Sequence, residues 1–260
     1  MTEGIILLDK PEGQTSFQAL GFLKRRLGTG RIGHAGTLDK FAEGLLIVLV
    51  GRMTRLCSLA TSLDKEYLAD LTFGRGTDTL DPEGAVTAVG RIPSPGEIEA
   101  VLPEFRGSLT QVPPAYSAVH VNGRRASDVA RSGKAVQLRP RPVRIDRLEM
   151  LEYRPPEASF RISCSKGTYI RSLARDIAAR LGTFAHVSRL RRIRIGGFSV
   201  ENARSPEAFD PARDVLSPAV FFSAVPELGK LAVKQQWTVP VSRGIKLEST
   251  LFENAPAGEA

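Results

Sequence analysis

One carboxylate in this 260-residue chain stands where a loop could present it for chemistry. Asp39 lies in a polar, glycine-rich stretch, RIGHAGTLDKFAEG, that runs from Arg31 to Gly44. Glycine tolerates positive φ and lets another molecule approach the backbone. The next residues, Leu45–Val50, form an unbroken apolar run of the length of a buried strand. Because loops on a rigid scaffold carry much of a protein's function, Asp39 is a candidate catalytic group; the alternative is a tight turn that it merely caps.

The segment before this loop is predicted to form a strand and a helix. Gly4–Lys10 is mainly apolar and should form a buried strand that ends at Pro11. Thr15 or Ser16 can then cap a helix with apolar residues at helical spacing, which Gly28 would end.

Alternating apolar and polar residues predict further strands. Tyr67–Phe73 alternates in this way and runs into a polar, glycine-rich loop at residues 74–84. Leu190–Ile195 alternates as well, and its arginines would give the strand one basic face. Two more strands are expected at Arg144–Tyr153 and Ser159–Cys164.

A helix after the last of these strands could add charged groups to a site. Ile170–Leu181 has apolar residues at a period of 3.6, with Thr168 as the expected cap and Gly182 at the C-terminal end. Tyr169 and Arg171 would then lie in the first turn, where free N–H groups and the helix dipole favour a nearby anion. A solvated helix arginine is the alternative for Arg171.

The net charge of +8 is unevenly distributed. Between Arg161 and Arg194 there are nine Lys or Arg residues and one acid, Asp176, and between His120 and Arg147 there are eight against Asp128 and Asp146. Such segregation favours a surface for a polyanion such as nucleic acid, although two solvated basic faces would give the same pattern. A DNA-binding regulator has less support, because no helix-turn-helix or zinc pattern is present.

Several other classes of protein are disfavoured by the sequence. No apolar segment is long enough to span a bilayer, and the N-terminus lacks the features of a signal peptide. Cys57 and Cys164 are expected to be reduced thiols of a cytoplasmic protein. The scattered histidines and these cysteines show no metal-ligand spacing, so we expect no metal site.

Motifs in five segments, in this order along the chain, resemble those of the TruB-type tRNA pseudouridine synthases. They are KPEGQTS at residues 10–16, GHAGTLD at 33–39, the loop at 74–84 with the preceding Tyr67, KGTYIRSL at 166–173 and LRRIRIGGF at 190–198. A single motif could be coincidence, but the ordered set covers most of the chain.

This resemblance implies a fold and a division into domains. The fold would be an α/β (α+β) pseudouridine-synthase fold, with a large, mixed, mainly antiparallel sheet flanked by helices. Residues 1–224 would form the catalytic domain, with an RNA-gripping insertion at about 106–142. Residues 225–260 would form a small C-terminal β appendage, too short for a complete PUA-like domain.

The resemblance also implies a reaction. Uridine 55 in the T loop of tRNA would become pseudouridine: the N1–C1′ bond breaks, and C5 joins C1′. The enzyme would need no cofactor or metal, and we expect it to act as a monomer. Asp39 would be the catalytic carboxylate, either as a nucleophile or as a base that removes a sugar proton; the sequence leaves both roles open.

Six residues are predicted to bind the substrate on the same grounds. Tyr67 would stack on the target base, Tyr169 would lie beside it, and Arg171 would hold Asp39 ionised. His34 could occupy the space that flipped bases vacate. The set is completed by Lys10 and Leu190.

The chain departs from the usual motifs at four positions. Lys40 replaces a proline after the aspartate, Glu43 replaces Thr or Ser, and His120 and Ser127 replace Lys and Tyr in the insertion. None of these changes removes a predicted catalytic group. A non-catalytic tRNA-binding protein or RNA-folding chaperone on the same fold remains the alternative function.

Overall fold

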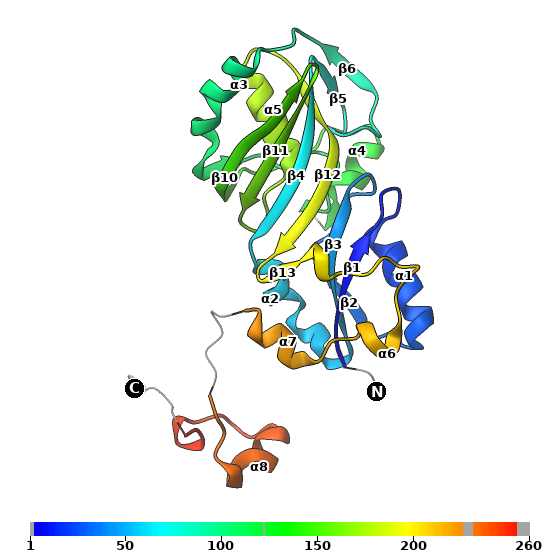
Figure 1. The fold of residues 1–260 in the computed structure, drawn as a ribbon, viewed down its shortest axis with the longest axis vertical. Coiled ribbons are helices and arrows are strands. Elements are labelled where there is room, and N and C mark those ends of the chain that lie inside the picture. Colours follow the sequence, from blue (N-terminus) through cyan, green and yellow to red (C-terminus); the bar gives the residue numbers. More distant parts are fainter. Residues whose placement is uncertain (1–2, 122, 226–230, 254–260) are drawn as a thin grey trace. The chain divides into compact units, whose positions relative to one another are not determined.

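The computed structural model describes residues 3–121, 123–225 and 231–253 (Figure 1). By its internal contacts the chain divides into one large compact unit, Met1–Phe221, and one small unit, Phe222–Ala260. The predicted assignment of catalysis to residues 1–224 stays a prediction.

The large unit is built on one mixed sheet. Among the described residues it has nine strands, with the order β1-β3-β12-β4-β11-β10-β7, while β2 pairs with β3 and β13 with β12. The strand bounds are β1 Gly4–Lys10, β2 Ile32–Ala35, β3 Glu43–Val50, β4 Lys65–Phe73, β7 Gly107–Gln111, β10 Arg141–Arg154, β11 Glu157–Cys164, β12 Ala185–Ile195 and β13 Phe198–Ser199. Only β3 and β12 pair in parallel, and every other pairing in this sheet is antiparallel. The predicted mixed, mainly antiparallel sheet is confirmed.

Helices and two small hairpins complete the large unit. The helices are α1 Ser16–Leu27, η1 Gly51–Leu56, α2 Cys57–Ser62, α3 Pro95–Val101, η2 Leu102–Phe105, α4 Ala126–Arg131, α5 Ile170–Arg180, η3 Val200–Asn202 and α6 Pro211–Asp214, with α7 Pro218–Ser223 at the boundary between the units. The hairpins are β5 Arg75–Thr77 with β6 Val86–Val89, and β8 His120–Val121 with β9 Arg124–Arg125.

The apolar patterns explain which faces are buried. β3 is buried along nearly its whole length, as its unbroken apolar run predicts. In β4 the buried residues alternate with half-buried ones, because α5 covers one face of the sheet at β4 and β12 (Figure 1). The apolar face of α5 packs there with β4 and β11 in one core cluster.

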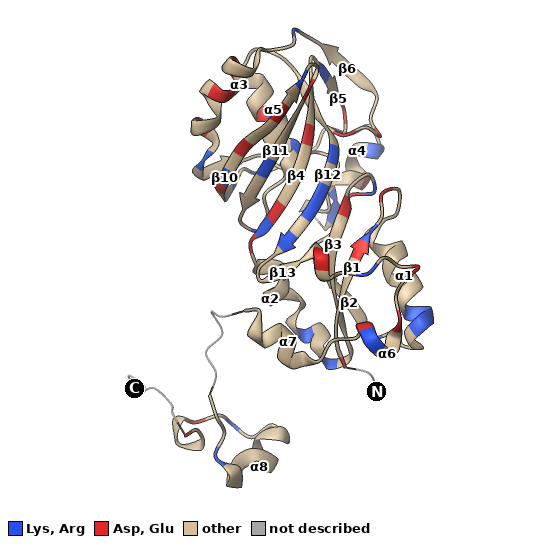
Figure 2. Ribbon diagram, viewed as in Figure 1, with Lys and Arg blue, Asp and Glu red and all other residues tan. Residues whose placement is uncertain are grey.

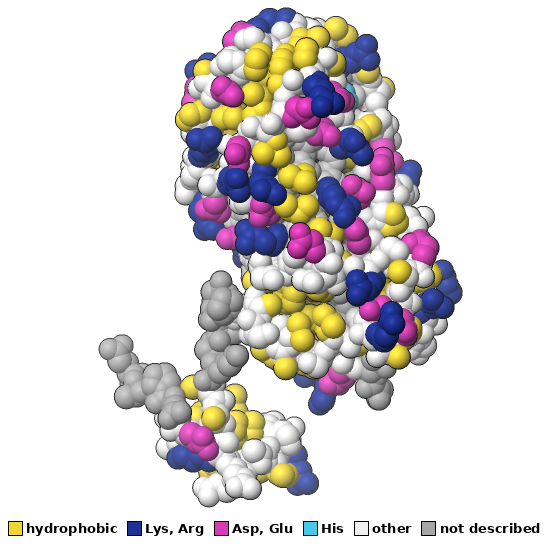
Figure 3. Space-filling view, viewed as in Figure 1, with side chains coloured by type: hydrophobic (Ala, Val, Ile, Leu, Met, Phe, Trp, Pro, Cys, Tyr) yellow, Lys and Arg dark blue, Asp and Glu magenta, His cyan; other side chains and the backbone are white. Residues whose placement is uncertain are grey.

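The opposite face of the sheet carries charges of both signs. Figure 2 shows both basic and acidic residues along β10, β11 and β4 but only basic ones on β12, and Figure 3 shows charged side chains of both signs on this face with apolar side chains between them. Arg194 and Arg161 both pair with Glu66, at 2.9 and 3.3 Å. The predicted basic face of β12 is therefore partly neutralised by acids from other segments, a pairing that charge counted along the sequence cannot reveal.

Helix α1 begins and ends where the sequence predicts. Thr15 is its N-cap and forms a capping box with Gln18, and Gly28 adopts a left-handed conformation after its last turn. Helix α5 differs from the prediction, because its N-cap is Tyr169 and Thr168 does not cap it. Gln111, at the end of β7, accepts a hydrogen bond from the N–H of this N-cap residue at 2.8 Å, so a side chain distant in the sequence fixes the start of the helix.

The predicted C-terminal β appendage is wrong for the residues that the structure describes. Residues 231–253 contain η4 Gln235–Trp237, α8 Thr238–Ser242 and η5 Ser249–Leu251. The β pairing described there is one isolated bridge, between Val233 and Phe252. Pro240 has no N–H to donate to a strand ladder, and it lies inside α8 instead. No helix in the described ranges is long and apolar enough to cross a membrane.

Candidate active site

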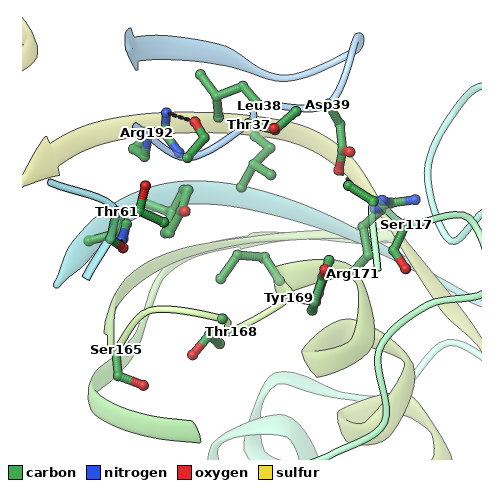
Figure 4. Close-up of a pocket in the computed structure, with 17 residues that line it drawn as sticks. Thr37, Leu38, Asp39, Thr61, Ser117, Ser165, Thr168, Tyr169, Arg171 and Arg192 are labelled. Carbon is green, nitrogen blue, oxygen red and sulfur yellow. Dashed lines mark hydrogen bonds and ion pairs between the residues drawn. The ribbon is translucent and has the colours of Figure 1, made fainter. Parts of the chain in front are cut away.

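The loop that carries Asp39 is held from two sides. The hydroxyl of Ser16 in α1 accepts a hydrogen bond from the Leu38 N–H at 3.0 Å and donates to the Leu38 carbonyl at 3.2 Å. From β12, the Arg192 guanidinium donates to the Gly36 carbonyl at 3.0 Å (Figure 4). Because Ser16 and Arg192 are both buried, they fix the position of the backbone next to Asp39.

Asp39 faces a buried arginine from the start of α5. Arg171 Nε lies 2.9 Å from Asp39 Oδ2, and the two side chains point toward each other in Figure 4. The Nε–H does not point at the carboxylate, so the contact is an ion pair without hydrogen-bond geometry. Arg171 is only 3% exposed, which excludes a solvated helix arginine. The predicted closeness of Arg171 to Asp39 is thus observed, although their roles are proposals.

Arg171 also binds three other groups. Its Nη1 donates to Asp81 Oδ2 at 3.0 Å and to the Thr79 carbonyl at 2.8 Å. Its Nη2 donates to the Tyr116 carbonyl at 2.9 Å. A single guanidinium therefore joins the Asp39 loop, the glycine-rich loop after β5 and the segment that follows β7.

The surroundings of Asp39 set its acidity. Burial raises the pKa of the Asp39 carboxyl above its ordinary value, and the Arg171 guanidinium opposes this rise. The negative charges of Asp81 and Glu83 raise the pKa further. The carboxyl is nevertheless 39% exposed, and because it lines the cavity described next, a ligand there can reach it.

A partly open cavity of about 260 Å³ lies beside this ion pair. Its wall includes Asp39, Arg171, Tyr67, Tyr169 and Leu190. A wider groove of about 580 Å³ adjoins it, and both share Leu38, Asp39, Ser117 and Arg171 among their walls. The volume of the inner cavity is near the lower end of the roughly 300–1,000 Å³ typical of ligand pockets, which suits one small ring system.

The structure brings four predicted substrate-binding residues to the inner cavity: Tyr67, Tyr169, Arg171 and Leu190. Tyr67 is buried, and burial raises the pKa of its hydroxyl, with the Arg192 guanidinium opposing the rise. Burial also raises the pKa of Tyr169. Both phenols are therefore neutral near pH 7 and present an aromatic ring with a hydroxyl donor.

The other two predicted residues lie outside the inner cavity. His34, in β2, lines the adjoining groove. Burial lowers the pKa of its imidazole. Its Nδ1 is buried and has no hydrogen-bond partner among the described residues. Lys10 is fully buried at the end of β1, where its ammonium donates to the carbonyls of Pro11 and Gln14 at 2.8 and 2.6 Å. A role for Lys10 in substrate binding stays a prediction, since it lines neither space.

Three further residues at the site were missed by the sequence interpretation: Asp81, Arg192 and Lys65. Asp81 lies in the glycine-rich loop that we noted without assigning it a role. Arg192 shares the inward face of β12 with Leu190, so strict alternation could have predicted its burial. Lys65 lines the inner cavity, and burial lowers its pKa to about 8.

The unusual residues near the motif form ion pairs. Lys40 Nζ lies 3.1 Å from Glu83 Oε1, and Glu43 Oε2 lies 3.4 Å from Arg191 Nη1. These pairs are partly exposed, so each contributes little to stability. In the described ranges, no group of three or more His, Cys, Asp or Glu side chains is arranged to hold a metal ion.

Comparison with known families and proteins gives a consistent result. The family model described as TruB family pseudouridylate synthase (N terminal domain) matches residues 24–170, and that of the tRNA pseudouridylate synthase B C-terminal domain matches residues 171–210. The tRNA pseudouridine synthase B of Borreliella burgdorferi (strain ZS7) is 45% identical over 206 residues, which cover 78% of this chain and 73% of that protein. The protein of the same name from Zymomonas mobilis is 45% identical over 208 residues, with coverages of 78% and 69%.

Solved structures resemble the fold over nearly the whole chain. A chain in the crystal structure of a Cbf5-Nop10-Gar1 complex aligns with a TM-score of 0.73 at 29% identity, covering 96% of this chain and 69% of that one. A chain in the structure of an H/ACA RNP bound to a substrate RNA containing 2′-deoxyuridine gives a TM-score of 0.71 at 27% identity, with the same coverages.

Proposed function

The chain belongs to the TruB family of pseudouridylate synthases, and we propose that it acts on uridine 55 in the T loop of tRNA with Asp39 as the catalytic carboxylate. The reaction class, isomerisation of tRNA uridine to pseudouridine, follows from family membership. The target position and the residue roles are our proposal. The observation that carries it is the Asp39–Arg171 ion pair at the wall of a cavity that Tyr67 and Tyr169 also line.

The reaction conserves the atoms of the nucleoside except for an exchanged proton. The N1–C1′ bond breaks, the uracil turns within the site, C5 bonds to C1′, and the proton on C5 leaves while N1 gains one. Asp39 either bonds to C1′ or removes a proton from C2′ to start the sequence. Both routes require an ionised carboxylate, so the charge of Arg171 offsets the burial that favours the neutral acid.

To enter the inner cavity, the target base must leave the stack of neighbouring bases in the RNA. A base stacked within folded RNA cannot enter a cavity of this size and reach the carboxylate in its wall, so the uridine must be flipped outward. Tyr67 then stacks on the uracil, and Leu190 and Tyr169 complete its surroundings. His34, on the adjoining groove, takes part of the space that the flipped nucleotide leaves.

Residues 106–142 are proposed to grip the RNA outside the cavity. Arg124, Arg125 and Arg131 are exposed on the β8–β9 hairpin and α4, and Arg125 and Arg131 line the groove. Tyr116, in the same insertion, binds Arg171 through its carbonyl. Contact between the insertion and RNA phosphates would therefore act on Arg171 directly, through the Tyr116 carbonyl.

We propose that the enzyme acts as a monomer and that residues 1–224, which contain every residue assigned to catalysis, form its catalytic part. Its place of action would be the cytoplasm, where its substrate tRNA occurs. A purely RNA-binding role has no need of a carboxylate paired with a buried guanidinium at a cavity wall, and no observation favours it.

Tritium release from transcripts labelled at uridine C5 tests the substrate assignment. We expect release from an unmodified tRNA transcript and none when uridine 55 alone is replaced by cytidine. Equal release from both transcripts would place the target elsewhere. Tight binding of the transcript without any release would favour the RNA-binding alternative.

A further inference from the structure

Phe17 is the most exposed large hydrophobic side chain in the described part of the chain, at 76%. A single exposed apolar residue is normal on a protein surface and by itself indicates nothing. The position of Phe17 is unusual, because it lies in the first turn of α1 and lines the groove that adjoins the catalytic cavity. An aromatic ring left open at the approach to an RNA-modifying site is suited to stacking with a base.

The first turn of α1 is rigidly attached to the catalytic loop. Ser16, the residue before Phe17, makes both of its hydrogen bonds to Leu38, the residue before Asp39. The capping box between Thr15 and Gln18 fixes the same turn from the other side. The backbone of Phe17 is therefore held at a fixed position relative to Asp39, which reduces the entropy lost when a ligand stacks on the ring.

Positive charges lie near the ring. Lys24 Nζ is 5.9 Å from the ring centroid of Phe17, and no carboxylate within the described ranges lies within 4.0 Å of this ammonium. The walls of the groove also include Arg125 and Arg131 from the insertion. An aromatic ring with one cation beside it, in a groove that also has arginines in its wall, matches the two parts of a nucleotide, a base and a phosphate.

The groove also contains an unsatisfied buried polar atom. His34 Nδ1 is buried and has no hydrogen-bond partner among the described residues, and His34 lines the same groove as Phe17. Buried polar atoms in proteins are nearly always paired with protein or ordered water. His34 therefore gives the groove wall an imidazole whose Nδ1 makes no hydrogen bond to the described residues.

We propose that Phe17 stacks on a nucleobase next to the target uridine, with Lys24 binding a phosphate of the same strand. The inference rests on the proposed function, in which the flipped uridine fills the inner cavity. The groove and the cavity share Leu38 and Asp39 in their walls, so the groove is the space next to the uridine that its adjoining nucleotides can enter. Flipping removes a stacking partner from these neighbours, and the Phe17 ring replaces it.

Steady-state kinetics of Phe17→Ala, Phe17→Leu and Phe17→Tyr test the proposal. Since one base–aromatic stack changes affinity substantially, we expect KM for the tRNA transcript to rise about 10-fold or more in the Ala variant, with kcat nearly unchanged. Tyr should retain the wild-type KM, because it keeps the ring. Leu should behave like Ala, because it keeps the apolar volume and loses the ring.

Two further measurements separate stacking from a structural effect. Val89→Ala removes a side chain of similar exposure, 73%, outside both cavities, and should leave KM unchanged. A transcript with 2-aminopurine at each position flanking the uridine in turn should show fluorescence quenching at one position with wild type and Phe17→Tyr, and much less with Phe17→Leu.

The outcomes distinguish this inference from the proposed function. If wild type converts the transcript and Phe17→Leu has the wild-type KM and quenching, the stacking proposal is wrong. If wild type converts no tRNA transcript at all, the proposed function is wrong, and with it the premise of the stacking proposal.

Discussion

Asp81 and Asp39 bind the same guanidinium: Arg171 Nη1 lies 3.0 Å from Asp81 Oδ2, and Arg171 Nε lies 2.9 Å from Asp39 Oδ2. Asp81 is buried and also accepts hydrogen bonds from the Thr79 hydroxyl and the Glu83 N–H, so its own position is fixed. It therefore orients Arg171 and at the same time adds a negative charge that raises the pKa of Asp39.

Asp81→Asn should shift the pH dependence of the enzyme. The amide keeps the shape, and its single oxygen can still accept from Arg171 although the bond from the Glu83 N–H is then lost; the charge that raises the pKa of Asp39 is removed. Activity that needs ionised Asp39 disappears as pH falls through its pKa, so the acid limb of the kcat profile should move to lower pH. A limb that stays in place or moves to higher pH would contradict this electrostatic role.

Arg171→Lys should reduce kcat while the protein stays folded. A lysine ammonium cannot reach both carboxylates and the carbonyls of Thr79 and Tyr116 in the fixed geometry of the guanidinium. We expect kcat to fall by about 100-fold or more, as for loss of a preorganised charge in an active site. Circular dichroism serves as the folding control, and an unchanged kcat would show that charge alone is sufficient.

Gly44→Ala tests the attachment of the catalytic loop to the sheet. Gly44 has φ of +105°, and an added Cβ would lie 2.3 Å from the Arg192 carbonyl oxygen, on the strand with which β3 pairs in parallel. We expect a loss of stability above about 2 kcal/mol in urea unfolding.

Gly21→Ala is the matched control for this substitution. Gly21 lies inside α1, and its added Cβ would approach only the flexible end of Arg25, at 3.9 Å. It should be neutral or stabilising by up to about 1 kcal/mol. Similar losses in the two variants would contradict the close packing of β3 on β12.

Lys65→Met should change how stability depends on pH. Burial lowers the pKa of Lys65 from 10.5 to about 8 in the folded chain. Between these pH values the unfolded chain holds a proton that the folded chain has released, so wild-type stability gains up to about 1.4 kcal/mol per pH unit from this group as pH rises. The difference in unfolding free energy between wild type and Lys65→Met should therefore change across this window, and parallel curves would contradict the prediction.

The parts of the fold that the sequence predicts are those with a local cause. The apolar run of β3, the alternation in β4 and the capping signals of α1 each act within a few residues, and all appear where expected. Pro240 shows the converse: the resemblance implied a β appendage at residues 225–260, but Pro240 has no N–H to donate to a strand ladder and lies inside α8.

The contacts within the site depend on segments far apart in the sequence. The closeness of Arg171 to Asp39 was expected from a family resemblance, and neither spacing nor composition predicts it. Asp81 meets Arg171 across 90 residues, and Gln111 at the end of β7 accepts from the Tyr169 N–H at the start of α5 across 58 residues. Such pairings are fixed by tertiary packing, for which a single sequence has no local signal.

The central claim is that Asp39 is the catalytic carboxylate, and single-turnover tritium release by Asp39→Asn tests it most directly. With enzyme in excess over C5-labelled tRNA transcript, wild type should release the tritium of one uridine. Asp39→Asn, which keeps the size of the side chain and loses its charge, should bind the transcript with similar affinity and release none. Release by the Asn variant at a rate close to that of wild type would contradict the claim and assign the chemistry to another residue.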